Sequence, residues 1–360
     1  MSKISFVIVG AGWRARFYLR VARALPDLFS VGGMVVRDPA KGEAIEREWG
    51  VPTYRDIEAL LKGGRPRFCV SSVSWASNPE IILELVDHGL PVLSETPPAP
   101  DVPGLKALVE RVRASLGMVQ VAEEYHLRPL HLAQAEVLYR GLLGPVGHVN
   151  VSVGHGYHGI SLMRRFLGVT FEAARIHGFG FPYSIVQGPG REGPPAREQI
   201  VEERQDLFVF QFPDRRVGIV DFTGSQYFGW IRADHLLARG ERGEMDWDDI
   251  VMLKDFATPL RLRIERVESG RYGSLAAPRL EGFRFGESWI WRNPYPAPLM
   301  DDELALCEVL SRMAAYTEGG AELYPLAEGV HDHYLYLKAQ ESAARGSAEV
   351  NATPAEWGGP

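Results

Sequence analysis

The feature that most restricts the fold is a glycine turn between an apolar run and a helical pattern near the start of the chain. The β-branched run Ile4–Val9 is followed by GAGWRA, residues 10–15, which matches the pattern G-x-G-x-x-A. In a strand–turn–helix unit, the first glycine permits a tight turn and the second lets a pyrophosphate approach the backbone. Free N–H groups at the helix start then face the phosphates. The turn predicts dinucleotide binding by Gly10, Gly12, Trp13, Arg14 and Ala15, with a purely structural turn as the alternative.

Short β-branched runs alternate with helical patterns through the first third of the chain. The expected strands cover residues 4–9, 32–36, 68–73, 91–94 and 117–121, and helices are expected at 15–25, 41–49, 79–88 and 102–114. Such alternation is typical of a parallel sheet with crossover helices. Residues 1–124 are therefore predicted to form an N-terminal Rossmann domain with a parallel sheet.

Beyond residue 124 the pattern changes to longer strands with turn signals between them. Strands are expected at 147–153, 206–212, 216–222, 230–237 and 244–253, and Pro213-Asp214 is predicted to turn a hairpin. Residues 125–346 are predicted to form a C-terminal α+β domain with a large, mostly antiparallel open sheet. The segment Phe181–Arg197, rich in proline and glycine, is expected to be a long surface loop, and residues 347–360 a flexible tail.

Composition narrows the class of protein. With 360 residues the chain is long enough for two domains. A net charge of −7 argues against binding of nucleic acid, which needs a concentrated basic face. The two cysteines, Cys69 and Cys307, indicate neither a disulfide framework nor a metal site, and we assign no metal. The start of the chain reads as a strand rather than a signal segment, and no apolar run is long enough to span a membrane. We expect a cytoplasmic protein.

The end of the second expected strand bears on the choice of dinucleotide. An NAD-binding site places Asp or Glu there for the ribose 2′-hydroxyl. In this chain Asp38 precedes Pro39 and a helical run, so we interpret it as a helix N-cap. Arg37, with Lys41 nearby, favours a 2′-phosphate and hence NADP over NAD, while an exposed Arg37 without a ligand is the alternative.

Five segments in order resemble the Gfo/Idh/MocA oxidoreductases, the group of glucose-fructose oxidoreductase and inositol dehydrogenase. They are VIVGAGWRA, HGLPVLSETPPA, HGISLMRRFLG, HLLARGERGEMDWDD and YPLAEGVHDHYLYLKAQESAARG. The resemblance extends from residue 4 to about residue 346. It implies a Rossmann domain followed by an α/β domain whose open sheet commonly mediates dimers or tetramers. It also implies hydride transfer between a nicotinamide and a sugar-like or polyol carbonyl.

The resemblance also assigns cofactor-contacting positions in the first domain. Ser74 and Trp75 follow the third expected strand, where the family contacts the cofactor, and Asn78 replaces the usual histidine. At the family's Glu-Lys-Pro corner, Glu95 and Pro97 match, but Thr96 replaces the lysine. Thr96 cannot supply the positive charge, although its hydroxyl can form hydrogen bonds.

Further departures concern the polar groups near the substrate. Glu124-Tyr125-His126 stands where the family has Asn-x-Arg. Of the family's Asp, His and Asp in the second domain, only His158 matches, since Gly154 and Ser161 occupy the acid positions. Two of the three expected polar catalysts are therefore missing.

The residues themselves offer replacements for the missing acid. His155, Tyr157 and His158 precede an apolar pattern with helical spacing, so His158 is expected at a helix N-terminus, where the dipole disfavours the imidazolium. We predict His158, Tyr157 and His126 as catalytic residues, with Glu124 and His155 facing the substrate. The alternative for His158 is a capping or core histidine, and for His126 a surface or interface histidine.

The sequence leaves three hypotheses for function. The first is an NAD(P)-dependent oxidoreductase that acts on a small sugar-like, polyol or carbonyl substrate as a homodimer or homotetramer. The second keeps the dinucleotide bound and uses transient oxidation for elimination or hydrolysis of a glycoside, with no net redox change. The third is a redox-silent dinucleotide-binding sensor or subunit.

Overall fold

The computed structural model describes residues 3–275, 277–353 and 357, which form two compact units. Unit 1 contains the chain up to Pro129, together with Val267–Gly282 and Arg292–Val330. Unit 2 contains Leu130–Arg266, Phe283–Trp291 and the chain from His331. The first stretch of unit 1 thus ends beyond the boundary expected at residue 124, and later segments return to it.

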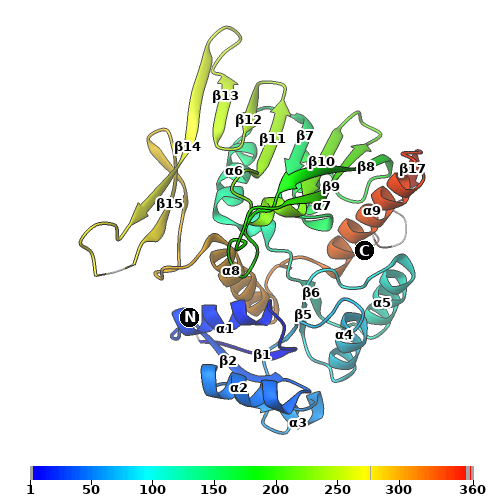
Figure 1. The fold of residues 1–360 in the computed structure, drawn as a ribbon, viewed down its shortest axis with the longest axis vertical. Helices are drawn as coiled ribbons and strands as arrows, with labels where there is room; N and C mark the ends of the chain where they lie inside the picture. Colours follow the sequence, from blue (N-terminus) through cyan, green and yellow to red (C-terminus); the bar gives the residue numbers. More distant parts are fainter. Residues whose placement is uncertain (1–2, 276, 354–356, 358–360) are drawn as a thin grey trace. The chain divides into compact units, whose positions relative to one another are not determined.

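Unit 1 is built on a six-stranded parallel sheet with the order β3-β2-β1-β4-β5-β6, of which Figure 1 labels β1, β2, β5 and β6. The strands are β1 Ile4–Val9, β2 Phe29–Val35, β3 Thr53–Tyr54, β4 Cys69–Ser71, β5 Val92–Ser94 and β6 Val119–Val121. This order is that of a Rossmann fold, which confirms the prediction for the first domain. Because β1 and β4 are neighbours, their carboxyl ends meet where such sheets bind ligands.

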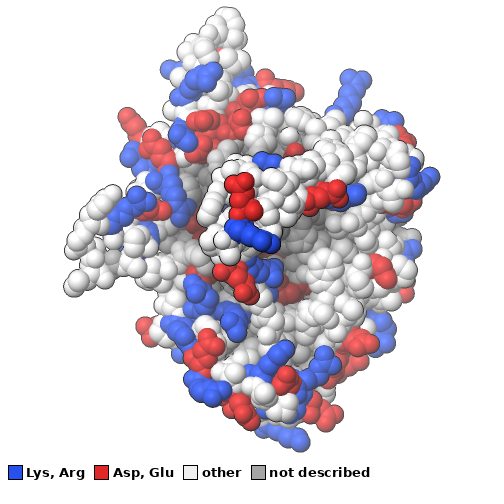
Figure 2. All heavy atoms as spheres, viewed as in Figure 1, with Lys and Arg blue, Asp and Glu red and all other residues white. Residues whose placement is uncertain are grey.

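The helices of unit 1 include one from late in the chain. They are α1 Ala15–Ala24, α2 Pro39–Trp49, α3 Ile57–Leu61, α4 Asn78–Asp87, α5 Val102–Ala114, the 3-10 turn η1 Tyr125–Leu127 and α8 Asp301–Tyr316. Helix α8, brown in Figure 1, packs against α1 and β1. The lower part of Figure 2, over α2 and α3, shows acidic and basic side chains interspersed, which is typical of a solvated helix face.

Unit 2 is built on an eleven-stranded sheet with the order β16-β15-β14-β13-β12-β11-β7-β10-β9-β8-β17. The strands are β7 Val146–Ser152, β8 Ala174–Val186, β9 Ile200–Gln211, β10 Val217–Thr223, β11 His235–Gly240, β12 Gly243–Asp246, β13 Asp249–Leu253, β14 Pro259–Ser269, β15 Arg279–Phe285, β16 Ser288–Arg292 and β17 Val350–Ala352. Its described pairings are antiparallel except for β10 with β7. This confirms the predicted large, mostly antiparallel sheet.

The remaining helices are α6 Pro129–Tyr139, α7 Tyr157–Leu167, the 3-10 turn η2 Gly224–Tyr227 and α9 Leu326–Ala344. Helix α7 packs on β7 and β10. Helix α9 lies close to β8, since a Cβ on Gly178 would be 2.2 Å from the Ala339 carbonyl oxygen. Among the described residues, no helix is both long and apolar enough to cross a membrane.

Part of the segment expected to be a loop is a strand. Phe181–Val186 continues β8 and pairs with β9 as far as Val186 opposite Ile200. The loop expected from residue 181 was wrong over these residues, because the proline and glycine content of the segment was taken to exclude a regular ladder. β17 pairs with β8 only at Ala174–Ile176, so Pro182 lies where the described ladder has one neighbouring strand, and there a missing N–H is tolerated.

Two other strand predictions were wrong in their limits. The run expected at 244–253 is a hairpin of β12 and β13, because Trp247 has a φ of +56° and turns the chain. The run expected at 230–237 begins as a strand only at His235. The hairpin at Pro213-Asp214 is confirmed between β9 and β10.

Residues near the end of the chain add a strand to the sheet. Val350–Ala352 forms β17 and pairs with Ala174–Ile176 of β8. Trp357 is 2% exposed, and its ring centroid lies 5.3 Å from that of Tyr334. These residues fall in the segment expected to be a flexible tail.

Candidate functional site

The glycine turn of unit 1 has the shape that a pyrophosphate needs. Gly10 has a φ of +110°, and a Cβ there would lie 2.1 Å from the Ser72 carbonyl oxygen, so only glycine fits. A Cβ on Gly12 would meet no described atom within 4 Å. Helix α1 then begins at Ala15 without a side-chain cap on Arg14. Backbone N–H groups and open space therefore coincide at this turn, and the residues fit a dinucleotide.

Two tryptophans lie exposed beside the turn. Trp13, within the turn, is 47% exposed, and Trp75, after β4, is 46% exposed. The Trp13 ring packs edge-on against Phe17, with centroids 4.7 Å apart. Ser74 donates its hydroxyl to Ser77 at 3.0 Å. Because β1 and β4 are neighbours, the structure places these predicted cofactor residues at one edge of the sheet.

The chain around the end of β2 holds a helix cap and two arginines, one after β2 and one after β3. The Asp38 carboxylate accepts the N–H groups of Ala40 (2.9 Å) and Lys41 (3.2 Å), which confirms it as the N-cap of α2. Arg37 is exposed. Arg55, which the sequence analysis missed, donates to the Val36 carbonyl oxygen at 2.7 Å. Because the Asp38 carboxylate is used to cap α2, the charged side chains near this strand end that remain to meet a ligand include Arg37 and Arg55.

The corner at Ser94–Pro97 is braced by Asn78, where the family has histidine. Asn78 is 2% exposed and accepts the Ser71 hydroxyl at 2.7 Å. Its amide donates to the Ser94 hydroxyl and to the carbonyl oxygens of Glu95 and Pro97 at 3.0–3.1 Å. The departure from histidine thus comes with a side chain that ties β4, β5 and the corner together.

A cation stands at this corner although Thr96 carries none. The Arg14 guanidinium donates through Nε to Glu95 Oε1 at 3.1 Å and through Nη2 to Glu124 Oε2. The Tyr18 hydroxyl donates to the same Glu95 oxygen at 2.5 Å. Burial raises the pKa of Glu124 to about 7, although Arg14 acts to lower it. From the sequence these residues could be named only singly, because the arginine that joins the two glutamates comes from a distant part of the chain.

His126 lies in a different environment from the turn residues. It belongs to η1 and is 8% exposed. Its ring centroid is 5.2 Å from that of Tyr324, a residue that is 1% exposed. The ring is therefore packed among interior side chains of unit 1.

Unit 2 gathers imidazoles and phenols at the start of α7. His155 Nε2 lies 3.2 Å from the Tyr157 hydroxyl, and His155 Nδ1 is hydrogen-bonded to the hydroxyl of Tyr227 from η2. The His158 ring centroid is 4.5 Å from that of Tyr157 and 5.1 Å from that of His155. His333 of α9 adds a ring 5.4 Å from Tyr157. The prediction that His158 lies at a helix N-terminus is confirmed, since α7 begins at Tyr157.

The charge state of this imidazole cluster is set mainly by burial. Burial, helped by His158 and His333, lowers the pKa of His155 to about 3. His155 is therefore neutral at pH 7, with both ring nitrogens against phenol hydroxyls. Such a chain of exchangeable protons can pass a proton along.

The two family acid positions in unit 2 hold residues with structural roles. Ser161 is 0% exposed and donates its hydroxyl to the His158 carbonyl oxygen at 2.9 Å. Gly154 has a φ of +68°. At the intervening Gly156, a Cβ would be 2.8 Å from the Tyr336 ring, so the chain before α7 needs glycine.

Sequence reasoning missed Tyr227, His333 and Tyr336 as members of this cluster. His333 and Tyr336 have i, i+3 spacing in a helical pattern, which was a usable signal. Tyr227 joins the cluster because β10, which leads into η2, pairs with β7, which leads into α7. The sequence gives no local sign of that pairing.

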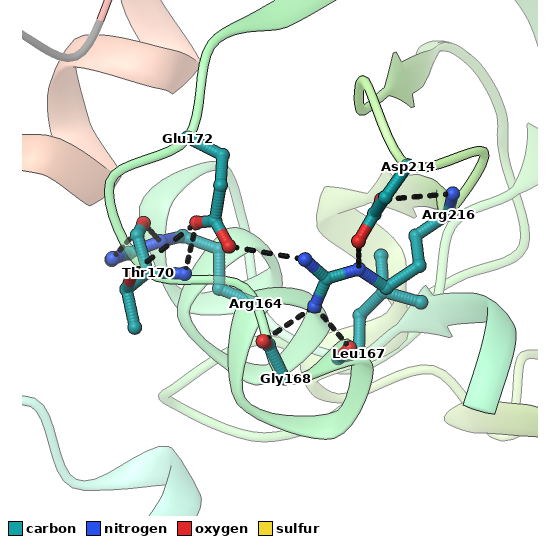
Figure 3. A network of polar contacts seen from close by, with 7 residues as sticks. All are labelled: Arg164, Leu167, Gly168, Thr170, Glu172, Asp214 and Arg216. Carbon is teal, nitrogen blue, oxygen red and sulfur yellow. Dashed lines mark hydrogen bonds and ion pairs between the residues drawn. The ribbon is translucent and has the colours of Figure 1, made fainter. Parts of the chain in front are cut away.

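Helix α7 is fastened at its far end by two arginines (Figure 3). Arg164 donates to Asp332 Oδ1 and to the Thr170 carbonyl oxygen, both at 2.6 Å, and Arg164 is 2% exposed. Arg216 donates to the Leu167 carbonyl oxygen at 3.1 Å and to Glu172 at 3.0 Å. Arg216 thus satisfies a carbonyl at the end of α7, and Arg164 ties the helix to α9 and to the chain that follows it.

His331 of α9, next to Asp332, is a core residue. His331 is 1% exposed and packs on Phe171, with ring centroids 5.1 Å apart. Burial, and then Arg164, hold the pKa of His331 well below its usual value. In the described part of the chain, no group of three or more His, Cys, Asp or Glu side chains is arranged to hold a metal ion.

Comparison with known proteins bears on the fold and on the first domain. Residues 4–123 match the family model of the Gfo/Idh/MocA oxidoreductases, described as an oxidoreductase family with an NAD-binding Rossmann fold. A search of curated proteins finds no match.

Solved structures match along nearly the whole chain. An oxidoreductase from Agrobacterium radiobacter in complex with NAD+, L-tartaric acid and magnesium has 15% identity and a TM-score of 0.69, covering 98% of this chain and 99% of that chain. A levoglucosan dehydrogenase in complex with NADH and levoglucosan has 16% identity and a TM-score of 0.71, covering 97% and 99%. A putative myo-inositol dehydrogenase from Sinorhizobium meliloti has 15% identity and a TM-score of 0.65, covering 98% and 100%.

At these low sequence identities the solved structures establish only the fold, whereas the family model matches the sequence of the first domain. The N-terminal domain therefore belongs to the Gfo/Idh/MocA oxidoreductases with their NAD-binding Rossmann fold, and the chain as a whole has the fold of solved oxidoreductases.

Proposed function

We propose that the protein is an NAD(P)-dependent oxidoreductase that transfers a hydride between a nicotinamide cofactor and a small sugar-like, polyol or carbonyl substrate. The observation that carries the proposal is the open Gly12 turn in front of the uncapped start of α1. When bound, the nicotinamide supplies or accepts the hydride.

The cofactor would be held by the turn and by the edge residues around it. These residues are Gly10, Gly12, Trp13, Arg14, Ala15, Ser74, Trp75, Glu95 and Thr96. Backbone N–H groups of the turn would bind the pyrophosphate, and the exposed indoles offer flat surfaces beside it.

We propose NADP as the preferred dinucleotide. The Asp38 carboxylate accepts N–H groups at the start of α2 and so serves as its cap. Arg37 is exposed, and Lys41 lies one helical turn further along the chain. An arginine at this position can hold a 2′-phosphate through charge-assisted hydrogen bonds. An Arg37→Ala variant should weaken NADPH binding by about tenfold or more and leave NADH binding nearly unchanged. Equal effects on both ligands would remove the assignment.

The proton for the substrate oxygen is assigned to the imidazole cluster of unit 2. His158 is the proposed proton donor and acceptor, with Tyr157 beside it and His155 facing the substrate. The neutral state of His155 and its two phenol contacts support a relay that needs no buried charge. His126 stands as a second candidate on unit 1.

The substrate class follows from chemistry and from the neighbours. Reduction of a carbonyl needs only a hydride and a proton donor at the developing alkoxide. Two of the similar structures hold polyhydroxylated molecules, levoglucosan and L-tartaric acid. We propose a small polyhydroxylated compound for this chain as well, handled by a homodimer or homotetramer formed through the sheet of unit 2.

The redox test is oxidation of NADPH or NADH by the purified protein with a panel of aldoses, ketoses, inosose and sugar lactones. His158→Ala should lower kcat by about 100-fold or more, the usual range for loss of a general acid. His177→Ala, which changes a histidine of β8 outside the cluster, is the matched control and should retain activity. Unchanged turnover in the His158 variant would contradict its assignment.

A redox-silent dinucleotide-binding protein is the second candidate function. The observation that favours it is the absence of the family lysine and of both family acids, at Thr96, Gly154 and Ser161. Tight binding of a dinucleotide without its consumption by any substrate in the panel would select this candidate. Retained cofactor with conversion of a glycoside, and no net redox change, would select elimination or hydrolysis instead.

A further inference from the structure

One arginine is shared by two glutamates at the carboxyl edge of the unit 1 sheet. Arg14 lies at the start of α1, Glu95 after β5 and Glu124 after β6, and both carboxylates accept from the same guanidinium. Tyr18 donates to Glu95, and burial raises the pKa of Tyr18 well above its usual value, so the phenol stays neutral. With both glutamates ionised, this group of four side chains has one positive and two negative charges.

Besides Arg14 and Glu95, the charged groups that act on Glu124 are Asp302 and Arg128, and these two pair with each other. Arg128, after η1, lies 2.9 Å from Asp302 of α8. Glu123 accepts the N–H of Tyr125 at 3.1 Å. His126, two residues on, packs against Tyr324. When Glu124 is ionised, the two carboxylates outweigh the positive charge of Arg14. When Glu124 is protonated, Glu95 alone balances that charge.

This balance matters because Arg14 lies two residues after Gly12. A pyrophosphate on the turn brings negative charge to the start of α1, where Arg14 is the N-cap residue. In a buried setting, two carboxylates and a pyrophosphate repel one another strongly. Uptake of one proton by a carboxylate is the simplest way to relieve that repulsion.

We propose that Glu124 takes up a proton when the dinucleotide binds, so that Arg14 changes from the partner of two carboxylates into a counter-ion for the pyrophosphate. The inference rests on the proposed dinucleotide binding. The proton comes from solvent and binds to a carboxylate oxygen of Glu124, and Arg14 keeps Glu95 as its other partner.

The direction of the pH dependence follows from linkage. Burial raises the pKa of Glu124 to about 7, so the ligand-free protein is already a mixture of both forms near neutral pH. A nearby anion raises this pKa further. Binding is therefore tightest at low pH, weakens as the pH rises from the pKa of Glu124 in the free protein toward its higher pKa in the complex, and levels off above that. Each unit by which binding raises the pKa changes the affinity about tenfold between the two limits.

The experiment measures the Kd of NADH between pH 6 and pH 8.5, followed by quenching of tryptophan fluorescence. NADH is the probe because it lacks the 2′-phosphate, which as a phosphomonoester would itself titrate near about pH 6. We expect the Kd to rise about tenfold over this range. Calorimetry at pH 7.5 in two buffers of different ionisation enthalpy should show uptake of a fraction of a proton.

Glu124→Gln keeps the shape of the protonated carboxyl and removes its titration. This variant should bind NADH with one Kd across the range and without proton uptake. Glu303→Gln is the matched control, because Glu303 pairs with Arg20 further along α1 at 2.5 Å. The control should keep the wild-type pH profile.

The outcomes separate the two proposals. Binding of neither NADH nor NADPH at any pH overturns both the function and this inference. Wild-type binding that is independent of pH, or a Glu124→Gln variant with the wild-type profile, overturns this inference alone. If the variant does not fold, the calorimetric proton uptake of the wild type decides. If only NADPH binds, its Kd is measured across the same pH range for the wild type and for Glu124→Gln. Titration of the 2′-phosphate affects both proteins equally, so the difference between the two profiles reports Glu124.

Discussion

At the scale of single residues, the two glycines of the turn have different tasks. Gly10 is required by the fold, because its positive φ and the nearby Ser72 carbonyl leave no room for a side chain. Gly12 is not required by the fold, since a Cβ there would meet open space. An open position that is nonetheless glycine is what close approach of a ligand demands.

This difference predicts opposite results for two matched substitutions. Gly12→Ala should leave the melting temperature nearly unchanged and weaken NADH or NADPH binding by about tenfold or more, because a methyl group fills the approach to the backbone. Gly10→Ala should lower the stability by about 1–3 kcal/mol, the usual cost of a strained backbone. Thermal unfolding and fluorescence titration of both variants check this. Wild-type affinity in Gly12→Ala would count against a pyrophosphate at the turn.

At the scale of elements, helix α7 is held at both ends by different means. Its start carries the imidazole cluster, and its end is anchored by Arg164 and Arg216. The ion pair of Arg164 with Asp332 is almost fully buried, with side chains 2% and 3% exposed. The two ends of α7 are therefore anchored by chemically different contacts, aromatic rings at the start and arginines at the end.

Asp332→Asn should unfold more easily than the wild type by about 3–5 kcal/mol, because it leaves the Arg164 charge buried without its carboxylate. Glu172→Gln changes the more exposed pair with Arg216 and should cost less than about 1 kcal/mol. Urea denaturation of both variants measures the two free energies. Equal losses would show that burial does not govern these pairs.

The elements also show what the sequence could predict. The parallel sheet, the turn, the N-cap at Asp38 and the start of α7 follow from local patterns, because each depends on neighbours in the chain. The contact of Tyr227 with His155 and the sharing of Arg14 by Glu95 and Glu124 depend on strand order. The strand at Phe181–Val186 was missed because the proline and glycine content of the segment indicated a loop, although Pro182 is tolerated where the ladder has one neighbouring strand.

At the scale of the whole molecule, the buried His155 links the imidazole cluster to acid stability. Its pKa falls from the ordinary value of 6.5 to about 3 on folding, so the unfolded chain binds a proton that the folded chain refuses. This contribution to stability is fully present above pH 6.5 and is lost as the pH falls from 6.5 toward 3. Each unit between the two pKa values corresponds to about 1.4 kcal/mol.

His155→Gln should therefore lose less unfolding free energy than the wild type when the pH falls from 7 to 4. The difference in unfolding free energy between wild type and variant should shift by about 2–4 kcal/mol in favour of the variant between pH 7 and pH 4. Denaturant unfolding at several pH values measures this difference. A difference that stays constant with pH would show that folding leaves the pKa of His155 unchanged.

The short strand β17 has a consequence for how the chain behaves when it is cut. β17 satisfies the outer backbone groups at the beginning of β8, which would otherwise offer N–H and C=O groups to any passing strand. Removal of the residues from Val350 onward would leave the sheet able to recruit extended segments from other molecules. β17 thus shields this edge of the sheet from pairing with other chains, and proteolytic trimming there should first appear as loss of solubility.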